Sequence, residues 1–180
     1  MENIRAPWEA RLRKWIVLSW GLAAAVMLAA AAFGYQAEAA LGGSATVQKI
    51  DAASIFRNNA AMLVSNLLGV LTLGLTNLSS GLLNGYAMGS AAYISIHQFG
   101  WGWMLKSFLP HGILEIPVIL LSVSMGAAPW MLLAQRVKYE RGDTGKMALT
   151  LGKYLMATAC VCLLALGLAA VIEANISMAG

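Results

Sequence analysis

Charged residues are scarce in this sequence, and their scarcity excludes most classes of soluble protein. They make up 11% of the 180 residues, whereas a soluble domain carries about 25%. Hydrophobic residues make up 59%, and the mean hydropathy is +0.70. This composition is typical of an integral membrane protein, and the length predicts a single membrane domain over residues 1–180.

Cysteine is nearly absent, which excludes a disulfide-stabilised fold. The two cysteines, Cys160 and Cys162, lie two residues apart within one apolar stretch. On a helix they point in different directions, so they cannot close a normal disulfide. Two thiols with no nearby histidine do not make a metal site. We interpret both as small apolar residues of a helix.

Acidic residues are fewer than basic ones, with 8 Asp and Glu against 12 Lys and Arg. The sequence lacks a run of basic residues interleaved with aromatics, and we therefore expect no nucleic-acid partner. The basic excess is better explained by cytoplasmic loops rich in lysine and arginine.

The apolar runs predict an all-α fold, a polytopic transmembrane helical bundle of about five spans. A spanning helix needs about 20 mainly apolar residues. The predicted spans cover residues 15–35, 59–78, 82–96, 108–134 and 147–172. Ala37-Glu38-Ala39 resembles a signal-peptidase site, but the apolar run before it exceeds the usual length of a signal peptide's core. We therefore expect the first helix to be retained.

The segments between these spans predict how the spans connect. Residues 36–55 are expected to form an outer loop, and residues 77–81 a tight turn that closes a hairpin. The aromatic segment 97–107 is broken by glycine and suits a membrane interface. Residues 135–146 are expected to form a cytoplasmic loop. Pro117 lies inside the fourth span and is expected to kink it.

The distribution of basic residues predicts the orientation of the chain. With the N-terminus inside, eight basic residues lie in the cytoplasm and three lie outside, as the positive-inside rule requires. The eight are Arg5, Arg11, Arg13, Lys14, Arg136, Lys138, Arg141 and Lys146, and the three are Lys49, Arg57 and Lys106. We therefore expect a multi-pass protein of the plasma (inner) membrane, with its N-terminus cytoplasmic and its C-terminus outside.

Glycine recurs at every fourth position in the third predicted span, at Gly81, Gly85 and Gly89. Such spacing leaves one smooth helix face against which another backbone can approach closely. The spacing predicts helix packing on this face, either with another helix of the same chain or with a second copy.

Asparagine side chains lie in or beside several predicted spans. An amide inside a bilayer needs a hydrogen-bonding partner. For each one singly, we expect an interhelical hydrogen bond that fixes packing. The asparagines are Asn58, Asn59, Asn66, Asn77 and Asn84.

The fourth span carries His111 and Glu115, which lie four residues apart and so share one helix face. A carboxylate inside a span costs about 2.5–3.5 kcal/mol on insertion scales and suggests a functional site. The predicted topology brings the start of the second span, Arg57 to Asn59, and the end of the fifth, Glu173, to the same depth. One histidine with two carboxylates matches the ligand count of a catalytic zinc site. The same residues also fit a structural hydrogen-bonded pair.

The chain resembles the stage II sporulation protein M family of multi-span membrane proteins. The resemblance covers about residues 55–176 and rests most specifically on the Pro-His-Gly-x-x-Glu-x-Pro pattern of residues 110–117. The other matching segments are Ile55-Phe56-Arg57-Asn58-Asn59, Asn84-Gly85 and Ile172-Glu173-Ala174. The chain departs from the family's C-terminal pattern at Asn175-Ile176-Ser177, so its last turn is expected to differ.

This resemblance implies a bacterial membrane protein of the cell envelope. The founding member looks like a scaffold that recruits cell-wall hydrolases during sporulation, and other relatives are needed for the maturation of circular bacteriocins. Because the family also occurs in organisms that form no spores, we carry over the fold and the polar cluster and not the sporulation role.

Three functions agree with these residues. The first is a membrane scaffold or accessory subunit, in which an outer-leaflet cluster is structural or faces a partner. This cluster consists of Asn58, Asn59, His111, Glu115 and Glu173, and Arg57 and Asn84 are further polar residues assigned to it. The second is an intramembrane peptidase or peptide cyclase, in which His111, Glu115 and Glu173 hold a divalent metal such as zinc, or Glu115 acts as a general base. The third is a transporter or channel with Glu115 as its ion or proton site. The expected partners are the lipid bilayer, other membrane or envelope proteins, and a second copy of the chain.

Overall fold

The computed structural model describes residues 7–42, 51–138 and 144–178, and every regular element within them is helical. This confirms the predicted all-α class. The elements are α1 (Pro7–Leu41), α2 (Ala52–Leu68), the 3₁₀ turn η1 (Gly69–Thr72), α3 (Leu75–Phe99), α4 (Trp101–Ser124), the 3₁₀ turn η2 (Met125–Ala127), α5 (Ala128–Lys138) and α6 (Thr144–Met178).

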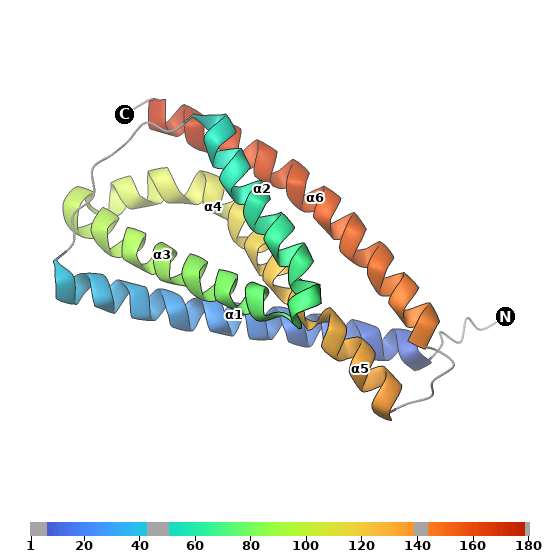
Figure 1. Ribbon diagram of the computed structural model, residues 1–180. Helices are drawn as coiled ribbons and strands as arrows, with labels where there is room; N and C mark the ends of the chain where they lie inside the picture. The colour runs from blue at the N-terminus through green and yellow to red at the C-terminus, as the bar shows by residue number, and fades with distance from the viewer. Residues whose placement is uncertain (1–6, 43–50, 139–143, 179–180) are drawn as a thin grey trace.

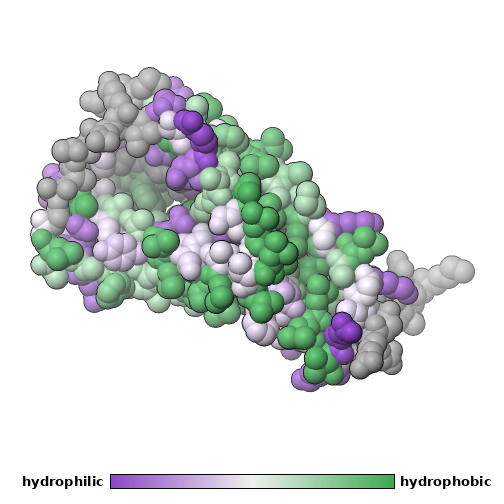
Figure 2. Space-filling model, in the orientation of Figure 1, coloured by the Kyte–Doolittle hydropathy of each residue, from purple (hydrophilic) through white to green (hydrophobic). Residues whose placement is uncertain are grey.

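Three helical segments of the described chain are long and apolar enough to cross a membrane. They are Glu9–Leu41, Gly112–Lys138 and Thr144–Asn175. The helices α1 and α6 have 35 residues each, and at 1.5 Å per residue each is roughly 52 Å long. A bilayer's hydrocarbon core is about 30 Å thick, so both helices extend beyond it. Figure 2 shows a mostly hydrophobic surface between hydrophilic residues at the start of α2 and near α5.

The hairpin between α2 and α3 turns earlier than predicted. The predicted turn at residues 77–81 is wrong, because these residues lie inside α3. The chain instead reverses at Leu73 and Gly74, whose φ angles of 54° and 87° are left-handed. The predicted second span, 59–78, is therefore interrupted, whereas residues 82–96 form part of α3. Gly74 adopts this conformation at little cost because it lacks a Cβ atom.

The fourth predicted span, 108–134, consists of α4, η2 and α5. Its helix begins earlier than predicted, because the aromatic segment 97–107 is interrupted only at Gly100. Both Pro110 and Pro117 lie within α4, and a kink at Pro117 stays a prediction. The predicted outer loop is shortened from both sides, since α1 continues to Leu41 and α2 begins at Ala52. Residues 43–50 and 139–143 of the two predicted loops lie outside the described residues.

The helices pack as two pairs with α4 between them. In Figure 1, α1 runs beside α3 and α2 beside α6, and the two pairs diverge toward the end where α3 meets α4. Three small apolar cores join them, one around Leu12 and Met147, one around Met27 and Val123, and one around Leu63 and Leu166. Cys162 belongs to the third core, whereas Cys160 is exposed, and both thiols are free.

The face formed by Gly81, Gly85 and Gly89, here called the glycine face, lies against α1 at Gly85 and Gly89, whereas Gly81 is nearest to Val123 of α4. A Cβ atom added at Gly85 would lie 2.5 Å from the carbonyl oxygen of Met27, and one added at Gly89 would lie 1.9 Å from that of Ala31. Only hydrogen fits at these positions. The glycine face therefore packs within the chain and sets how closely α3 approaches α1.

Candidate functional site

The first turn of α2 is fixed by a capping interaction. Asp51 precedes the helix, and its carboxylate accepts hydrogen bonds from the backbone N–H of Ser54 at 2.9 Å and from the Ser54 hydroxyl at 2.7 Å. These hydrogen bonds lower the pKa of Asp51, chiefly through the hydroxyl of Ser54. Arg57 donates to the same hydroxyl at 3.3 Å. Because the cap accounts for this serine–carboxylate contact, we assign Ser54 a structural role.

Of the next two residues of α2, Asn59 connects the helix to α4 and Asn58 bonds to Asn59. The side-chain amide of Asn59 donates a short hydrogen bond to a carboxylate oxygen of Glu115, and Asn58 donates to the side-chain oxygen of Asn59 at 3.4 Å. Asn59 and Glu115 are half-buried, whereas Asn58 is exposed. The amide thereby satisfies a carboxylate that is costly to bury without a partner.

Glu173 on α6 completes this group of side chains. It is half-buried, and it lies close enough to Glu115 to act on it electrostatically. The helix α6 packs against both α2 and α4, which brings residues separated by more than a hundred positions together. We call Asn58, Asn59, Glu115 and Glu173 the amide–carboxylate cluster.

The predicted metal site rests on His111 as well as on the two glutamates. The backbone of His111 lies in α4, one turn before Glu115, but its side chain lies outside the described residues. Among the described residues, no three His, Cys, Asp or Glu side chains are grouped so that they could hold a metal ion. The metal site therefore stays a prediction.

Two residues of the predicted polar cluster bond elsewhere. Arg57 is exposed and donates to Ser54, as described above. Asn84 lies on α3 and donates to the backbone carbonyl of Ser80 at 2.8 Å and to its hydroxyl at 3.3 Å. Asn84 thus belongs to a different polar group, deeper between the helices.

That deeper group, the serine–asparagine network, consists of Asn66, Asn77, Ser80, Asn84 and Ser122. The side-chain amide of Asn66 donates to the Ser122 hydroxyl at 2.9 Å and to the Ser80 hydroxyl at 3.2 Å. The amide of Asn77 donates to two backbone carbonyls, those of Asn66 at 2.8 Å and Ser122 at 2.9 Å. Asn66, Asn77 and Ser122 are buried, so their bonds join α2, α3 and α4 away from solvent.

Asn77 lies where two helices are interrupted. Both carbonyls that it binds come shortly before a 3₁₀ turn, η1 in one case and η2 in the other. A Cβ atom at Gly69 or at Gly126 would overlap the Asn77 side chain, at 1.8 Å and 2.7 Å. The two glycines therefore let the Asn77 amide lie between the two interrupted helices. Residues such as Ser122 were not predicted, because a serine in a run of leucine and valine carries no local signal of its partner.

A comparison with known families agrees with these features. The family model described as Stage II sporulation protein M matches residues 15–178. No curated protein and no solved structure matches the chain. Since the match includes all of the helices apart from the first residues of α1, the chain belongs to the stage II sporulation protein M family and is a membrane protein of that family.

Proposed function

We propose that this chain acts as an integral membrane scaffold or accessory subunit in a cell-envelope or peptide-processing assembly. The observation that carries the proposal is the hydrogen bond from Asn59 to Glu115, which uses the intramembrane carboxylate to join α2 to α4. Beside it, Arg57 and Asn58 are exposed and available to a partner. A carboxylate held by a neighbouring amide is suited to fixing helices in place.

The proposed topology places this cluster at the outer face of the plasma membrane. Exposed basic residues gather at the opposite end of the bundle, where α1 and α6 begin and α5 ends. They are Arg13, Lys14, Arg136, Lys138 and Lys146. By the positive-inside rule this end is cytoplasmic, and the C-terminal end of α6 is then outside.

Five helical segments enter the membrane in this topology, but α2 and α3 do so as a hairpin from the outer side. The residues around its turn are apolar and exposed, with Leu71 at 81%, Leu73 at 56% and Leu75 at 68%. The turn packs against η2, in the middle of the segment Gly112–Lys138. Exposed leucines are more stable in lipid than in water, and the non-helical backbone of the turn packs against η2, as backbone at membrane depth must. The hairpin is therefore expected to turn near the middle of the bilayer.

This proposal can be tested by photocrosslinking in the native membrane. A crosslinking residue at Asn58 is expected to give one discrete protein adduct, because this position is exposed beside the cluster. The same residue at Val64, which is 51% exposed farther along α2, serves as the control and is expected to meet lipid. Lipid adducts alone at both positions would count against a partner-binding scaffold.

One observation favours a second candidate, an intramembrane peptidase or peptide cyclase. Glu115 and Glu173 come from different helices and still interact electrostatically, and His111 lies one turn from Glu115 on the same helix. Two carboxylates and an imidazole are groups that can hold a divalent metal or transfer a proton. In that case substitution of Glu115 would abolish processing while the assembly still forms.

A further inference from the structure

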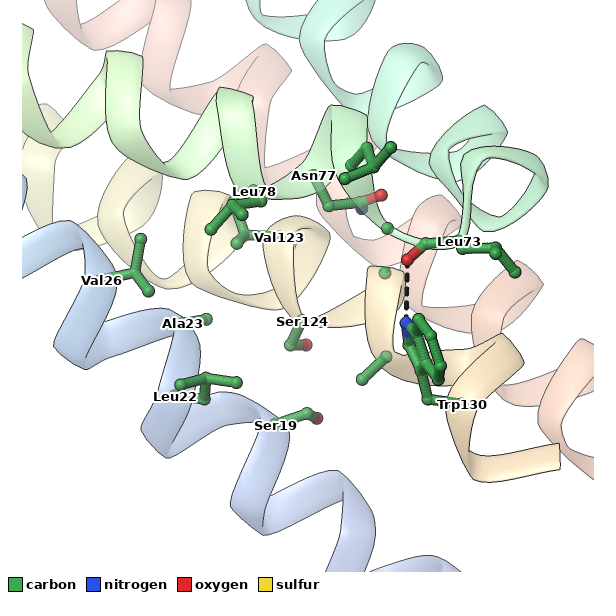
Figure 3. A pocket seen from close by; sticks show the side chains of 14 residues that line it. Ser19, Leu22, Ala23, Val26, Leu73, Asn77, Leu78, Val123, Ser124 and Trp130 are labelled. Carbon is green, nitrogen blue, oxygen red and sulfur yellow. Dashed lines mark hydrogen bonds between the residues drawn. The ribbon is translucent and has the colours of Figure 1, made fainter. Parts of the chain in front are cut away.

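A cavity of about 370 Å³ lies at the junction of α1, the hairpin turn and η2. Figure 3 shows its walls, which come from one face of α1, from the turn and the first residues of α3, and from the segment that links α4 to α5. The volume falls in the lower part of the range of about 300–1,000 Å³ that is typical of small-molecule sites. Its lining includes Leu22, Val26, Leu73, Leu78, Val123 and Trp130.

The few polar groups in the walls are already bonded within the protein. The hydroxyls of Ser19 and Ser124 donate to carbonyls of their own helices at 2.8 Å and 2.7 Å. The Trp130 indole N–H donates to the Leu73 carbonyl at 2.9 Å, the contact drawn in Figure 3. A water molecule needs two to four polar partners to be held in a cavity, so these walls favour a hydrocarbon occupant.

Asn77 also lines the cavity, but neither polar atom of its side chain is offered to an occupant. Its amide N–H groups bind the two backbone carbonyls described above. Its side-chain oxygen has no hydrogen-bond partner, but it is buried beside Gly69 and Gly126 and is not accessible from the cavity. The cavity wall is therefore apolar even at its asparagine.

The mouth of the cavity is open to the bilayer. Leu22, Leu73 and Trp130 each expose half or more of their surface beside it, at 67%, 56% and 52%. Leu22 and Trp130 belong to segments that are long and apolar enough to cross a membrane. The proposed topology places the turn at Leu73 within the bilayer, so the solvent around the mouth is lipid. An acyl chain is the hydrocarbon present there at the highest concentration.

Positive charge lies one to two helical turns from two residues that line the cavity, Ser19 and Trp130. Lys14 precedes Ser19 by five residues and Arg136 follows Trp130 by six, which at 1.5 Å per residue is roughly 8 Å and 9 Å along the two helices. Both cations are exposed. Exposed lysine and arginine next to a membrane span attract anionic lipid headgroups by about 1 kcal/mol each.

We propose that this cavity binds one acyl chain of an anionic phospholipid whose headgroup lies against the basic end of the bundle. The occupant is apolar because the polar side-chain atoms of the walls are either hydrogen bonded within the protein or, like the Asn77 oxygen, buried out of its reach. Its headgroup is anionic because cations of two different helices flank the mouth. A site of this kind fills the space at the helix interruptions and holds the hairpin turn against α1 and η2.

The test is native mass spectrometry of the full chain, with dioleoylphosphatidylglycerol and dioleoylphosphatidylcholine as probes. The wild type is expected to retain one phosphatidylglycerol and to prefer it to phosphatidylcholine. Leu22→Trp places a large side chain at the mouth and is expected to weaken retention about tenfold or more, because it fills space that about two methylene groups of the acyl chain would occupy. Val17→Trp is the control, because Val17 is 68% exposed on the same helix and lies outside the cavity.

A second variant separates the headgroup from the acyl chain and does not alter the cavity walls. Lys14→Gln combined with Arg136→Gln is expected to remove the preference for phosphatidylglycerol while one phospholipid is still retained. Equal retention by Leu22→Trp and by the wild type would overturn the proposal, as would equal wild-type affinity for the two lipids. A cavity filled by a second copy of the chain would also overturn it, and would appear as a dimer that Leu22→Trp dissociates.

Discussion

The glycine face predicts a graded response to the smallest possible substitution, glycine to alanine. A Cβ atom at position 81 would lie 3.2 Å from a methyl group of Val123, at position 85 it would lie 2.5 Å from the Met27 carbonyl oxygen, and at position 89 it would lie 1.9 Å from that of Ala31. A side-chain methyl can move by a few tenths of an ångström. A backbone carbonyl inside α1 cannot move without shifting the helix.

These distances give the expected magnitudes. Overpacking costs about 1–3 kcal/mol, whereas alanine gains up to about 1 kcal/mol over glycine in helix propensity. Gly81→Ala is therefore expected to change the free energy of unfolding by less than about 1 kcal/mol. Gly85→Ala is expected to destabilise by about 1 kcal/mol, and Gly89→Ala by about 2 kcal/mol, because its contact is shortest.

The assay is equilibrium unfolding of the purified protein in mixed micelles, followed by helical circular dichroism. Gly21→Ala on α1 serves as the control, because nothing lies within 4 Å of the added Cβ, and it is expected to be neutral or slightly stabilising. Equal costs at positions 81, 85 and 89 would refute the argument, since they would show that the packing distance does not set the response.

Three further predictions concern other parts of the molecule. Asn77→Ala is expected to lower the free energy of unfolding by about 2 kcal/mol in the same assay, because two interhelical hydrogen bonds are lost. Asn84→Ala breaks bonds within α3 only and should lower it by less than about 1 kcal/mol. Similar losses in the two variants would contradict this difference. In a variant without Cys160 and Cys162, a cysteine at Lys138 should be labelled from the cytoplasm and one at Asn175 from outside, and labelling of both from one side would exclude the proposed topology. Because the folded-state pKa of Asp51 is lowered, its cap should stabilise α2 at pH values above the ordinary aspartate pKa of about 3.9 and lose that effect as the pH falls through the lowered pKa. Hydrogen exchange of the first turn of α2 would measure this loss. A pH dependence that Asp51→Ala leaves unchanged would refute the prediction.

The parts of the fold that depend on residue periodicity could be predicted from the sequence. Hydropathy placed the long helices, and the four-residue spacing of Gly81, Gly85 and Gly89 indicated a packed face, which lies on α1. The predicted topology put the start of the second span at the same depth in the membrane as Glu115. In the structure, Asn59 donates a hydrogen bond to Glu115. Inferences of this kind need only the helix repeat and the order of the segments.

The hairpin turn could not be predicted from local sequence. Asn77 to Gly81 reads as a turn by composition, but Asn77 binds two backbone carbonyls from α2 and α4 and so belongs inside a helix. The observed turn uses Leu73 in a left-handed conformation, which leucine rarely adopts, and Gly74 was its only local signal. The tertiary contacts of η1 with η2 decide where the chain turns.

The most direct test of the proposed scaffold is a pair of substitutions at Glu115, assayed by complementation of a deletion strain. Glutamine keeps an oxygen that accepts the hydrogen bond from Asn59 and removes the charge, whereas leucine removes both. A scaffold role predicts that Glu115→Gln complements and that Glu115→Leu fails with reduced protein in the membrane. If Glu115→Gln folds and reaches the membrane at the wild-type level but fails to complement, the carboxylate itself is required, and the scaffold account is contradicted.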